Sequence, residues 1–249
     1  DQYTGGRRPW LEQWPTDLPE WIKRDRNHPS IIAWSLGNEL QTYPNLPFGD
    51  WGVTPYRMMK PVLQRYDNTR KITVAMHPRG RSLETDSLPA PLVMETDIAA
   101  YNYRYMYFPG DGRRFPWMTF YQSEANTSMM GPNYFEMDLD KVMGLAYWGQ
   151  IDYLGESRGW PAKGWNDGSF DISLQPKPIA YLLRSMFKPA EPVVHIGIVD
   201  TEADETEWNG IIFSNDGMSE HWNRTAGKKY NINVYTNAEH IDLIVNGKT

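Results

Sequence analysis

The first 190 residues alternate between two hydrophobic patterns. Short apolar runs, typical of strands buried on both faces of a parallel sheet, occur at 30–37, 71–76, 96–103, 117–124 and 142–150. Apolar residues at helical spacing occur at 16–29, 54–67 and 175–187. We expect the second of these helices to begin with Thr54 as N-cap and Pro55 at the first helical position. Strand–helix alternation predicts a parallel sheet, as in a (β/α)₈ barrel or an open doubly wound fold.

After about Val193 the pattern changes to strict alternation. One alternating segment contains Ile232 and Val234, and another, at 240–248, contains Ile241, Leu243 and Val245. This period is typical of antiparallel strands with one buried face. We therefore expect a barrel-type domain at 1–190, a connecting segment at 187–193 and part of a β-sandwich at 191–249.

Composition excludes several classes of function. The chain of 249 residues has a net charge of −6 and no basic run, which argues against nucleic-acid binding. No apolar run approaches the ~20 residues of a membrane span. There are no cysteines, and the five histidines form no HxxxH pair, so we expect no disulfide, metal or other cofactor. Compartment and oligomeric state stay open.

The chain does not begin with methionine and breaks off after VNGKT. A complete (β/α)₈ barrel takes about 250 residues, whereas residues 1–190 supply about five strands. We therefore expect part of a longer protein. If the fold is such a barrel, its first three strands lie upstream, and the pattern alone does not separate a barrel from an open doubly wound sheet.

Two glutamates directly follow apolar runs that we expect to be buried strands. Glu39 follows SIIAWSLGN, and Glu124 follows WMTFYQS. A buried charge is costly unless it is paired, and the carboxyl ends of parallel strands are where α/β proteins bind ligands. Glycoside hydrolysis needs two carboxyl groups, one to protonate the leaving oxygen and one to attack or assist at the anomeric carbon. The pattern does not say which glutamate has which role.

Other residues near these strand ends suit a sugar site. Asn38 could bind a sugar hydroxyl, and Tyr103, beside Asn102, could donate a hydrogen bond to Glu124. His77 follows the run 71–76 and could face the same cleft, although a lone histidine is more often structural. Trp148 suits either sugar stacking or the core. The chain has 11 Trp and 15 Tyr, many beside Gly and Pro, which also favours a carbohydrate partner.

Three other interpretations compete with an exo-acting glycosidase. A carbohydrate-binding protein would keep the fold and the aromatic residues without the chemistry, but it has no need of two carboxyl groups at strand ends. An endo-acting β-glycanase would cut inside a long chain. A purely structural sandwich protein disagrees with the strand–helix alternation.

Several motifs together resemble one enzyme family. RDRNHPSIIAWSLGNE closely resembles the acid/base signature of glycoside hydrolase family 2, which includes β-galactosidases, β-glucuronidases and β-mannosidases. DIAAYNY, FYQSEAN and AYWGQIDYLGES resemble the sixth, seventh and eighth barrel strands of that family, and QPKPIAYLLRSMF its closing helix. VYTNAEHIDLIVNGKT resembles the start of a following immunoglobulin-like domain.

The resemblance implies strands four to eight of a (β/α)₈ barrel and a retaining mechanism. It implies that Glu39 is the acid/base and Glu124 the nucleophile. It further implies that Asn38 contacts the hydroxyl next to the anomeric carbon, that Tyr103 supports the nucleophile and that Trp148 forms the floor of the sugar site.

One departure from the family pattern concerns the sugar. The β-glucuronidase members carry an Asn-x-Lys pair that holds the sugar carboxylate just before the closing helix. This chain has GWNDGSF there, with Asp167 near the position of the lysine. Because a carboxylate would repel glucuronate, we expect a terminal β-linked neutral sugar, with galactose first.

Overall fold

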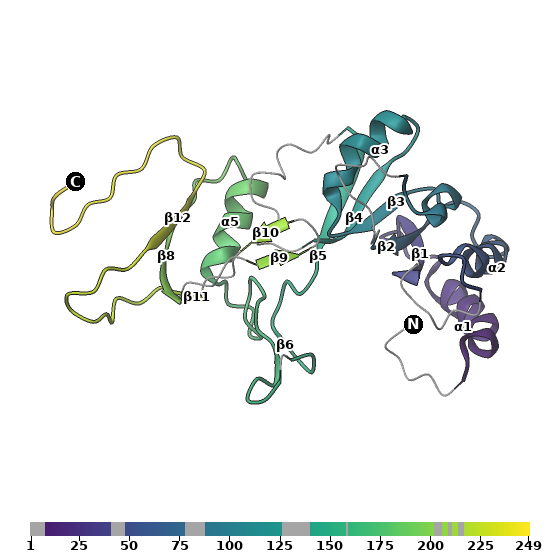
Figure 1. Cartoon of the computed structure of the whole chain (residues 1–249), viewed down its shortest axis with the longest axis horizontal. Helices are drawn as coiled ribbons and strands as arrows, with labels where there is room; N and C mark the ends of the chain where they lie inside the picture. Colours follow the sequence, from purple (N-terminus) through teal and green to yellow (C-terminus); the bar gives the residue numbers. More distant parts are fainter. Residues whose placement is uncertain are drawn as a thin grey trace. The chain divides into compact units, whose positions relative to one another are not determined.

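The computed structural model describes residues 8–40, 48–77, 88–125, 140–157, 159–201, 206–208, 211–213 and 217–249. They form two compact units that divide at about residue 146 (Figure 1). The first contains the described residues up to 125 together with 140–146, and the second contains those from 147 onward. The predicted domains at 1–190 and 191–249 remain a prediction.

The first unit is built on a five-stranded sheet in the order β1-β2-β3-β4-β5. Its strands are β1 (Ala33–Asn38), β2 (Lys71–Met76), β3 (Ala99–Asn102), β4 (Phe120–Ala125) and β5 (Val142–Tyr147). The pairs β1–β2, β2–β3 and β3–β4 are parallel. A doubly wound sheet reverses its strand order at a switch point, whereas this order follows the chain. The sheet therefore fits part of a (β/α)₈ barrel.

The first two strands differ in how many of their faces are buried. In β2 the residues Ile72, Val74 and Met76 are buried, and so is Thr73 between them, as expected for a strand covered on both faces. In β1 the predicted cover on both faces is wrong. Trp34 and Leu36 are buried, but Ser35 between them is exposed, so β1 packs against the core with one face.

Helical segments connect these strands: α1 (Trp10–Asp25), α2 (Val53–Gln64), the 3₁₀ turns η2 (Pro91–Glu95) and η3 (Tyr105–Tyr107), and α3 (Phe108–Arg114). The predicted start of α2 is wrong by two residues. Gly52, with φ of 82°, is the N-cap, and the amide of Thr54 donates to Asp50 Oδ2 at 2.8 Å. Asp50 thus satisfies one of the free amides of the first turn.

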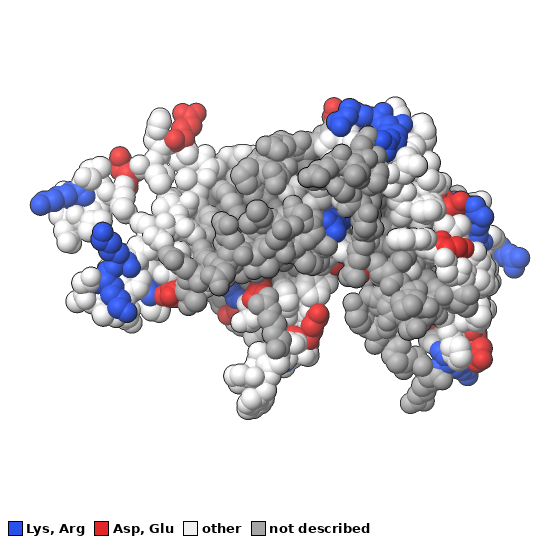
Figure 2. All heavy atoms as spheres, in the orientation of Figure 1, with Lys and Arg blue, Asp and Glu red and all other residues white. Residues whose placement is uncertain are grey.

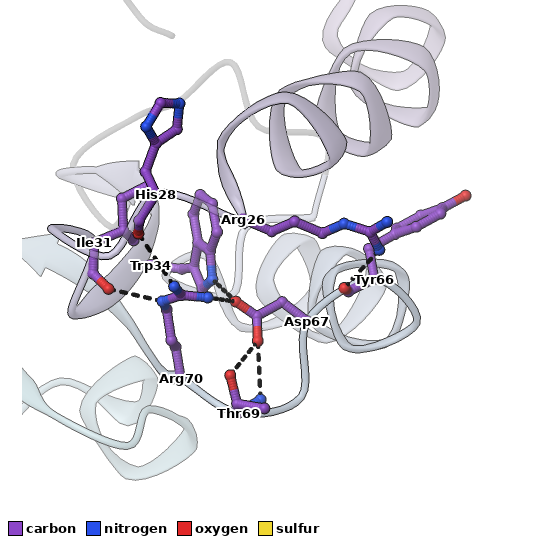
Figure 3. A network of polar contacts seen from close by, with 8 residues as sticks. All are labelled: Arg26, His28, Ile31, Trp34, Tyr66, Asp67, Thr69 and Arg70. Atoms are coloured by element: carbon purple, nitrogen blue, oxygen red, sulfur yellow. Dashed lines mark hydrogen bonds and ion pairs between the residues drawn. The ribbon is translucent and has the colours of Figure 1, made fainter.

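A polar network joins two chain connections at the N-terminal ends of β1 and β2 (Figure 3). The carboxylate of Asp67 accepts the indole N–H of Trp34 at 2.9 Å and the amide and hydroxyl of Thr69 at 2.9 and 2.7 Å. It also pairs with the guanidinium of Arg70. Burial would raise the pKa of Asp67, but these hydrogen bonds outweigh it and hold the pKa far below its usual range.

Arg70 extends this network to the connection between α1 and β1. Its Nε donates to the carbonyl of Ile31 at 2.7 Å, and a terminal nitrogen donates to the carbonyl of His28 at 3.2 Å. Residues about 40 positions apart are therefore fastened together at this end of the sheet. In barrels this end serves stability.

The second unit contains a hairpin, a helix and antiparallel strands. The hairpin pairs β6 (Tyr153–Leu154) with β7 (Gly164–Trp165). Helix α5 (Pro178–Phe187) packs against β8 (Val194–Thr201) and β12 (Ile232–Thr236). Strand β8 lies between β11 (Gly217–Ser219) and β12, and β9 (Thr206–Trp208) pairs with β10 (Ile211–Phe213). These strands are antiparallel as predicted, and the immunoglobulin-like assignment remains a prediction.

The strand predicted at 240–248 is not formed, so this prediction is wrong. This segment forms only an isolated bridge between Val245 and Lys248, and its apolar side chains at Ile241, Leu243 and Val245 are half exposed. An alternating sequence forms a strand only where a neighbouring strand accepts its hydrogen bonds and where other residues cover its apolar face. The described residues provide no such partner here.

Charge is distributed over the surface without one dominant sign. On the face drawn in Figure 2, the described Lys, Arg, Asp and Glu side chains lie in small groups of both signs. In the described part of the chain, no helix is long and apolar enough to cross a membrane.

Candidate active site

At the C-terminal end of β1 the chain leaves regular strand geometry. The register between β1 and β2 shifts between Ser35 and Asn38. Glu39 then adopts a left-handed φ of 51°, and its amide donates to the carbonyl of Ala75 at 2.7 Å. A non-glycine residue in this region costs about 1–2 kcal/mol, and such strain gathers at functional sites. The result is that two consecutive side chains, Asn38 and Glu39, reach the same neighbour.

The ends of β3 and β4 repeat this arrangement. The register shifts between Tyr101 and Asn102, so that Asn102 lies opposite Glu124. Tyr103 has a left-handed φ of 59°, and its amide donates to the carbonyl of Glu124 at 2.8 Å. Its phenol donates to Glu124 Oε2 at 2.6 Å. Bulges of this kind re-aim side chains next to active sites, and here both the backbone and the side chain of Tyr103 hold Glu124.

The neighbour that Asn38 and Glu39 share is Asn102. Its side chain is fully buried. Its Nδ2 donates to Asn38 Oδ1 at 3.0 Å and to Glu39 Oε1 at 3.2 Å, while its Oδ1 accepts the hydroxyl of Ser123 at 2.7 Å. Both amide hydrogens and the amide oxygen are therefore used, and one side chain joins the ends of β1, β3 and β4.

The two carboxyl groups receive different hydrogen bonds. Glu124 accepts a short bond from a phenol, and a bond of that length favours an ionised carboxylate. Glu39 accepts a longer bond from a neutral amide. Both side chains are half-buried. This inequality is the kind that separates the roles of paired carboxyl groups in acid–base chemistry.

His77 also lies at this end of the sheet. It follows β2, is 1% exposed, and meets the ring of Tyr103 edge-on with the ring centroids 6.3 Å apart. It therefore packs against the tyrosine that holds Glu124. Its proposed contact with substrate stays a prediction.

Trp148 belongs to the second unit. Its ring packs edge-on against the rings of Trp165 and Tyr153, with ring centroids 4.8 Å and 6.4 Å apart respectively. The next residue, Gly149, has a φ of 64°, and a β-carbon there would lie 2.5 Å from Trp165 Nε1. The chain thus brings this tryptophan into an aromatic cluster, and its role as the floor of a sugar site remains a prediction.

The segment before α5 holds a partly buried ion pair. Lys177 Nζ lies 2.7 Å from Asp152 Oδ2 and donates to the carbonyl of Asn166 at 2.6 Å. Asp152 also accepts the amide of Gly168 at 3.0 Å. These contacts tie the segment that contains Asp167 to the chain after β5, and Asp167 itself is exposed.

Among the described residues, no group of three or more His, Asp or Glu side chains could hold a metal ion. Five of the seven site residues predicted from the sequence form the linked arrangement at the ends of β1, β3 and β4: Asn38, Glu39, Asn102, Tyr103 and Glu124.

Sequence reasoning missed one member of this arrangement. Ser123 has no signal of its own, because a serine before a glutamate occurs in many contexts. The only available hint was its place beside Glu124 at a strand end. The register shift that brings it to Asn102 is a property of the paired strands.

Comparison with known proteins agrees with this architecture. Residues 4–108 match the family model described as glycosyl hydrolases family 2, TIM barrel domain. A β-galactosidase from Bacteroides ovatus, BoGH2A, is 24% identical over 317 aligned residues, which cover 96% of this chain and 33% of the relative. The chain thus spans about a third of the length of that relative. A putative β-glucuronidase from Formosa agariphila is 62% identical over 34 residues, 14% of this chain and 3% of that protein.

Solved structures show the same likeness. A glycosyl hydrolase family 2 member from Bacteroides cellulosilyticus superimposes with a TM-score of 0.75 at 27% identity, over 94% of this chain and 31% of the other. A β-glucuronidase from Ruminococcus gnavus shares the fold, with a TM-score of 0.53 at 20% identity over 72% of this chain and 36% of that one. Residues 4–108 are thus similar to the barrel domain of glycoside hydrolase family 2, and 94% of the chain is similar to a solved structure of a member of that family.

Proposed function

We propose that the protein containing this chain is a retaining exo-β-glycosidase that removes terminal β-linked neutral sugars, with galactose as the first candidate. The observation that carries the proposal is the linked pair of carboxyl groups at the ends of β1 and β4. Glu124 is held by Tyr103 at 2.6 Å, and Glu39 is held by Asn102 at 3.2 Å. Retaining glycosidases need two such groups with different tasks.

In the first step Glu124 acts as the nucleophile. The phenol of Tyr103 holds the carboxylate of Glu124 in place through Oε2. A bond forms between a carboxylate oxygen of Glu124 and the anomeric carbon as the bond from that carbon to the leaving oxygen breaks. Glu39, in its acid form, transfers its proton to that oxygen. The alcohol leaves, and the sugar stays attached to Glu124 as an ester.

In the second step Glu39 acts as the base. It takes a proton from water while the water oxygen attacks the anomeric carbon and the bond to Glu124 breaks. The sugar is released with its original configuration, and both carboxyl groups return to their starting states.

Asn38 fits a contact with the sugar. Its Oδ1 accepts the amide of Asn102, which directs the other end of its amide, the Nδ2 donor, away from that contact. The side chain is exposed. A donor beside the acid/base suits the hydroxyl next to the anomeric carbon.

The charges before α5 support a neutral sugar. The family resemblance puts a sugar-binding lysine of the glucuronidases near Asp167, and an exposed carboxylate there would repel a uronic acid. Lys177, which lies nearby in the sequence, is already paired with Asp152. The β-galactosidase from Bacteroides ovatus, similar over 96% of this chain, also supports galactose.

A β-glucuronide is the second candidate substrate. Relatives named β-glucuronidase match shorter segments, at 62% identity over 34 residues and 39% over 61 residues. Turnover of aryl β-galactoside and aryl β-glucuronide by the full-length protein separates the two. We expect the galactoside to be cleaved faster, and a clear preference for the glucuronide would overturn the sugar assignment.

The mechanism has a separate test. An aryl 2-deoxy-2-fluoro-β-glycoside of the accepted sugar should inactivate the full-length protein and label the peptide that contains Glu124. Proton NMR of early product should show the β-anomer. Labelling of another residue, or an α-product, would refute the assignment.

A further inference from the structure

Ser123 and Glu124 are consecutive on β4, and each engages one of two consecutive residues on β3. Ser123 Oγ donates to Asn102 Oδ1 at 2.7 Å, and Glu124 accepts the phenol of Tyr103 at 2.6 Å. The register shift at Asn102 makes both contacts possible. The strand that carries the nucleophile therefore also contacts the amide that holds the acid/base.

The hydroxyl of Ser123 supplies the hydrogen bond that the oxygen of the Asn102 amide accepts in the observed orientation. In the observed orientation, the two amide hydrogens face Asn38 Oδ1 and Glu39 Oε1, and the amide oxygen faces the serine hydroxyl. A flipped amide would place its oxygen against Asn38 Oδ1 and Glu39 Oε1, so these two acceptors favour the observed orientation and Ser123 satisfies the amide oxygen in it. Because Asn102 is fully buried, water cannot take over a contact that is lost.

We propose that Ser123 is a positioning residue for Glu39, acting through Asn102. It holds the oxygen of the amide in the orientation in which Asn102 donates to Glu39 Oε1, and this contact aims the acid proton of Glu39 at the leaving oxygen. Ser123 touches neither substrate nor the reacting atoms. The proposal rests on the proposed function, because it concerns the proton that Glu39 transfers.

The test compares substrates whose leaving groups need different amounts of protonation. In the full-length protein, Ser123→Ala should lower kcat/KM for an alkyl or p-methoxyphenyl β-glycoside ~10-fold, because a misdirected proton donor slows only steps that need it. The same variant should stay within about twofold of the parent for the 2,4-dinitrophenyl β-glycoside, whose leaving group departs without a proton. Ser123→Thr, which keeps the hydroxyl, should restore most of the alkyl glycosidase activity.

Ser35→Ala is the matched control. Ser35 is an exposed serine on β1 whose hydroxyl donates to the carbonyl of Gly37 at 3.2 Å. Removing it deletes the same group from the same sheet without touching Asn102. We expect no dependence on the leaving group in this variant.

The outcomes separate this proposal from the function on which it rests. Equal losses on both substrates in Ser123→Ala, or no loss on either, would overturn the role of Ser123 even if 2-fluoro labelling still marks Glu124. A Glu39→Gln variant that shows no dependence on the leaving group would instead overturn the assignment of Glu39. Activity on the dinitrophenyl substrate shows that each variant has folded.

Discussion

The two ends of the parallel sheet hold polar networks of opposite character. At the N-terminal end, Asp67 is buried, paired with Arg70 and bound by Trp34 and Thr69. At the C-terminal end, Glu39 and Glu124 are half-buried, and the donors described for them are the neutral groups of Asn102 and Tyr103. Both networks join residues far apart in the chain, and the first pairs its carboxylate with the guanidinium of Arg70.

This difference suits the first network to stabilising the fold and the second to chemistry. A carboxylate paired with a cation and bound by several donors stays ionised and unreactive, and removing it disrupts the fold. At the other end, Asn102 and Tyr103 hold Glu39 and Glu124 through neutral groups that add no positive charge. The strained φ values of Glu39 and Tyr103 occur at the second network, where the fold gives up some stability for geometry.

The largest effect should come from Glu124→Gln in the full-length protein. The amide keeps the size of the side chain and removes the nucleophile, so we expect kcat for an aryl β-glycoside to fall at least ~10⁴-fold, about 5.5 kcal/mol. The melting temperature should change by no more than a few degrees. Unaltered turnover would show that this end of the sheet is not catalytic.

Glu39→Gln should have a smaller effect that depends on the leaving group. Without a proton donor, kcat/KM for alkyl glycosides should fall ~10²- to 10³-fold. Attack on 2,4-dinitrophenyl glycosides needs no such donor, so the rate at which dinitrophenol is first released should change much less. Stopped-flow release of the phenol measures this step. Equal losses on both substrate types would contradict the role of Glu39 as the acid.

Asp67→Ala tests the other end of the sheet. Removing the carboxylate leaves the mostly buried guanidinium of Arg70 and the indole of Trp34 without their partner. We expect a loss of about 3 kcal/mol in the free energy of unfolding, measured by denaturant titration of the first unit in the full-length protein. The kcat at 25 °C should stay near that of the parent. A fall in kcat without a loss of stability would remove the distinction between the two ends.

Trp34→Phe is a milder change in the same network. The indole N–H bond to Asp67 at 2.9 Å is lost, while the bonds from Thr69 and Arg70 remain. We expect a loss of about 1.5 kcal/mol, near the lower end for a hydrogen bond to a charged group. The double variant Trp34→Phe, Asp67→Ala should lose less than the sum of the two single losses. Full additivity would show that the two residues do not interact.

The smallest expected effect is a difference in acid stability. The folded pKa of Asp67 is lowered, so its contribution is fully present above the unfolded pKa of about 3.9 and is lost as pH falls through the folded value. Between pH 5 and pH 3, the parent should lose about 1 kcal/mol that Asp67→Asn, which cannot titrate there, does not lose. Parallel stability curves for the two proteins would contradict this role.

Local sequence patterns predicted where the strands of the first unit lie better than they predicted which segments pair with a strand or cover it. The run KITVAM became β2 with the predicted bounds, because a short β-branched and apolar run suits a strand wherever it pairs. The equally regular segment at 240–248 did not become a strand in the described structure. Periodicity states which face of a strand would be buried, but it does not supply the neighbouring strand.

By itself, the sequence determined that Glu39 and Glu124 lie at or next to the ends of strands, as do Asn38, Asn102 and Tyr103. Residue order along each element is enough for that. Only the tertiary structure decided that Ser123 meets Asn102, that Asn102 meets Glu39, and that Asp67 meets Trp34. These contacts depend on strand register and on backbone angles at two strained residues. Pairing between distant segments sets register, so no local window of sequence contains it.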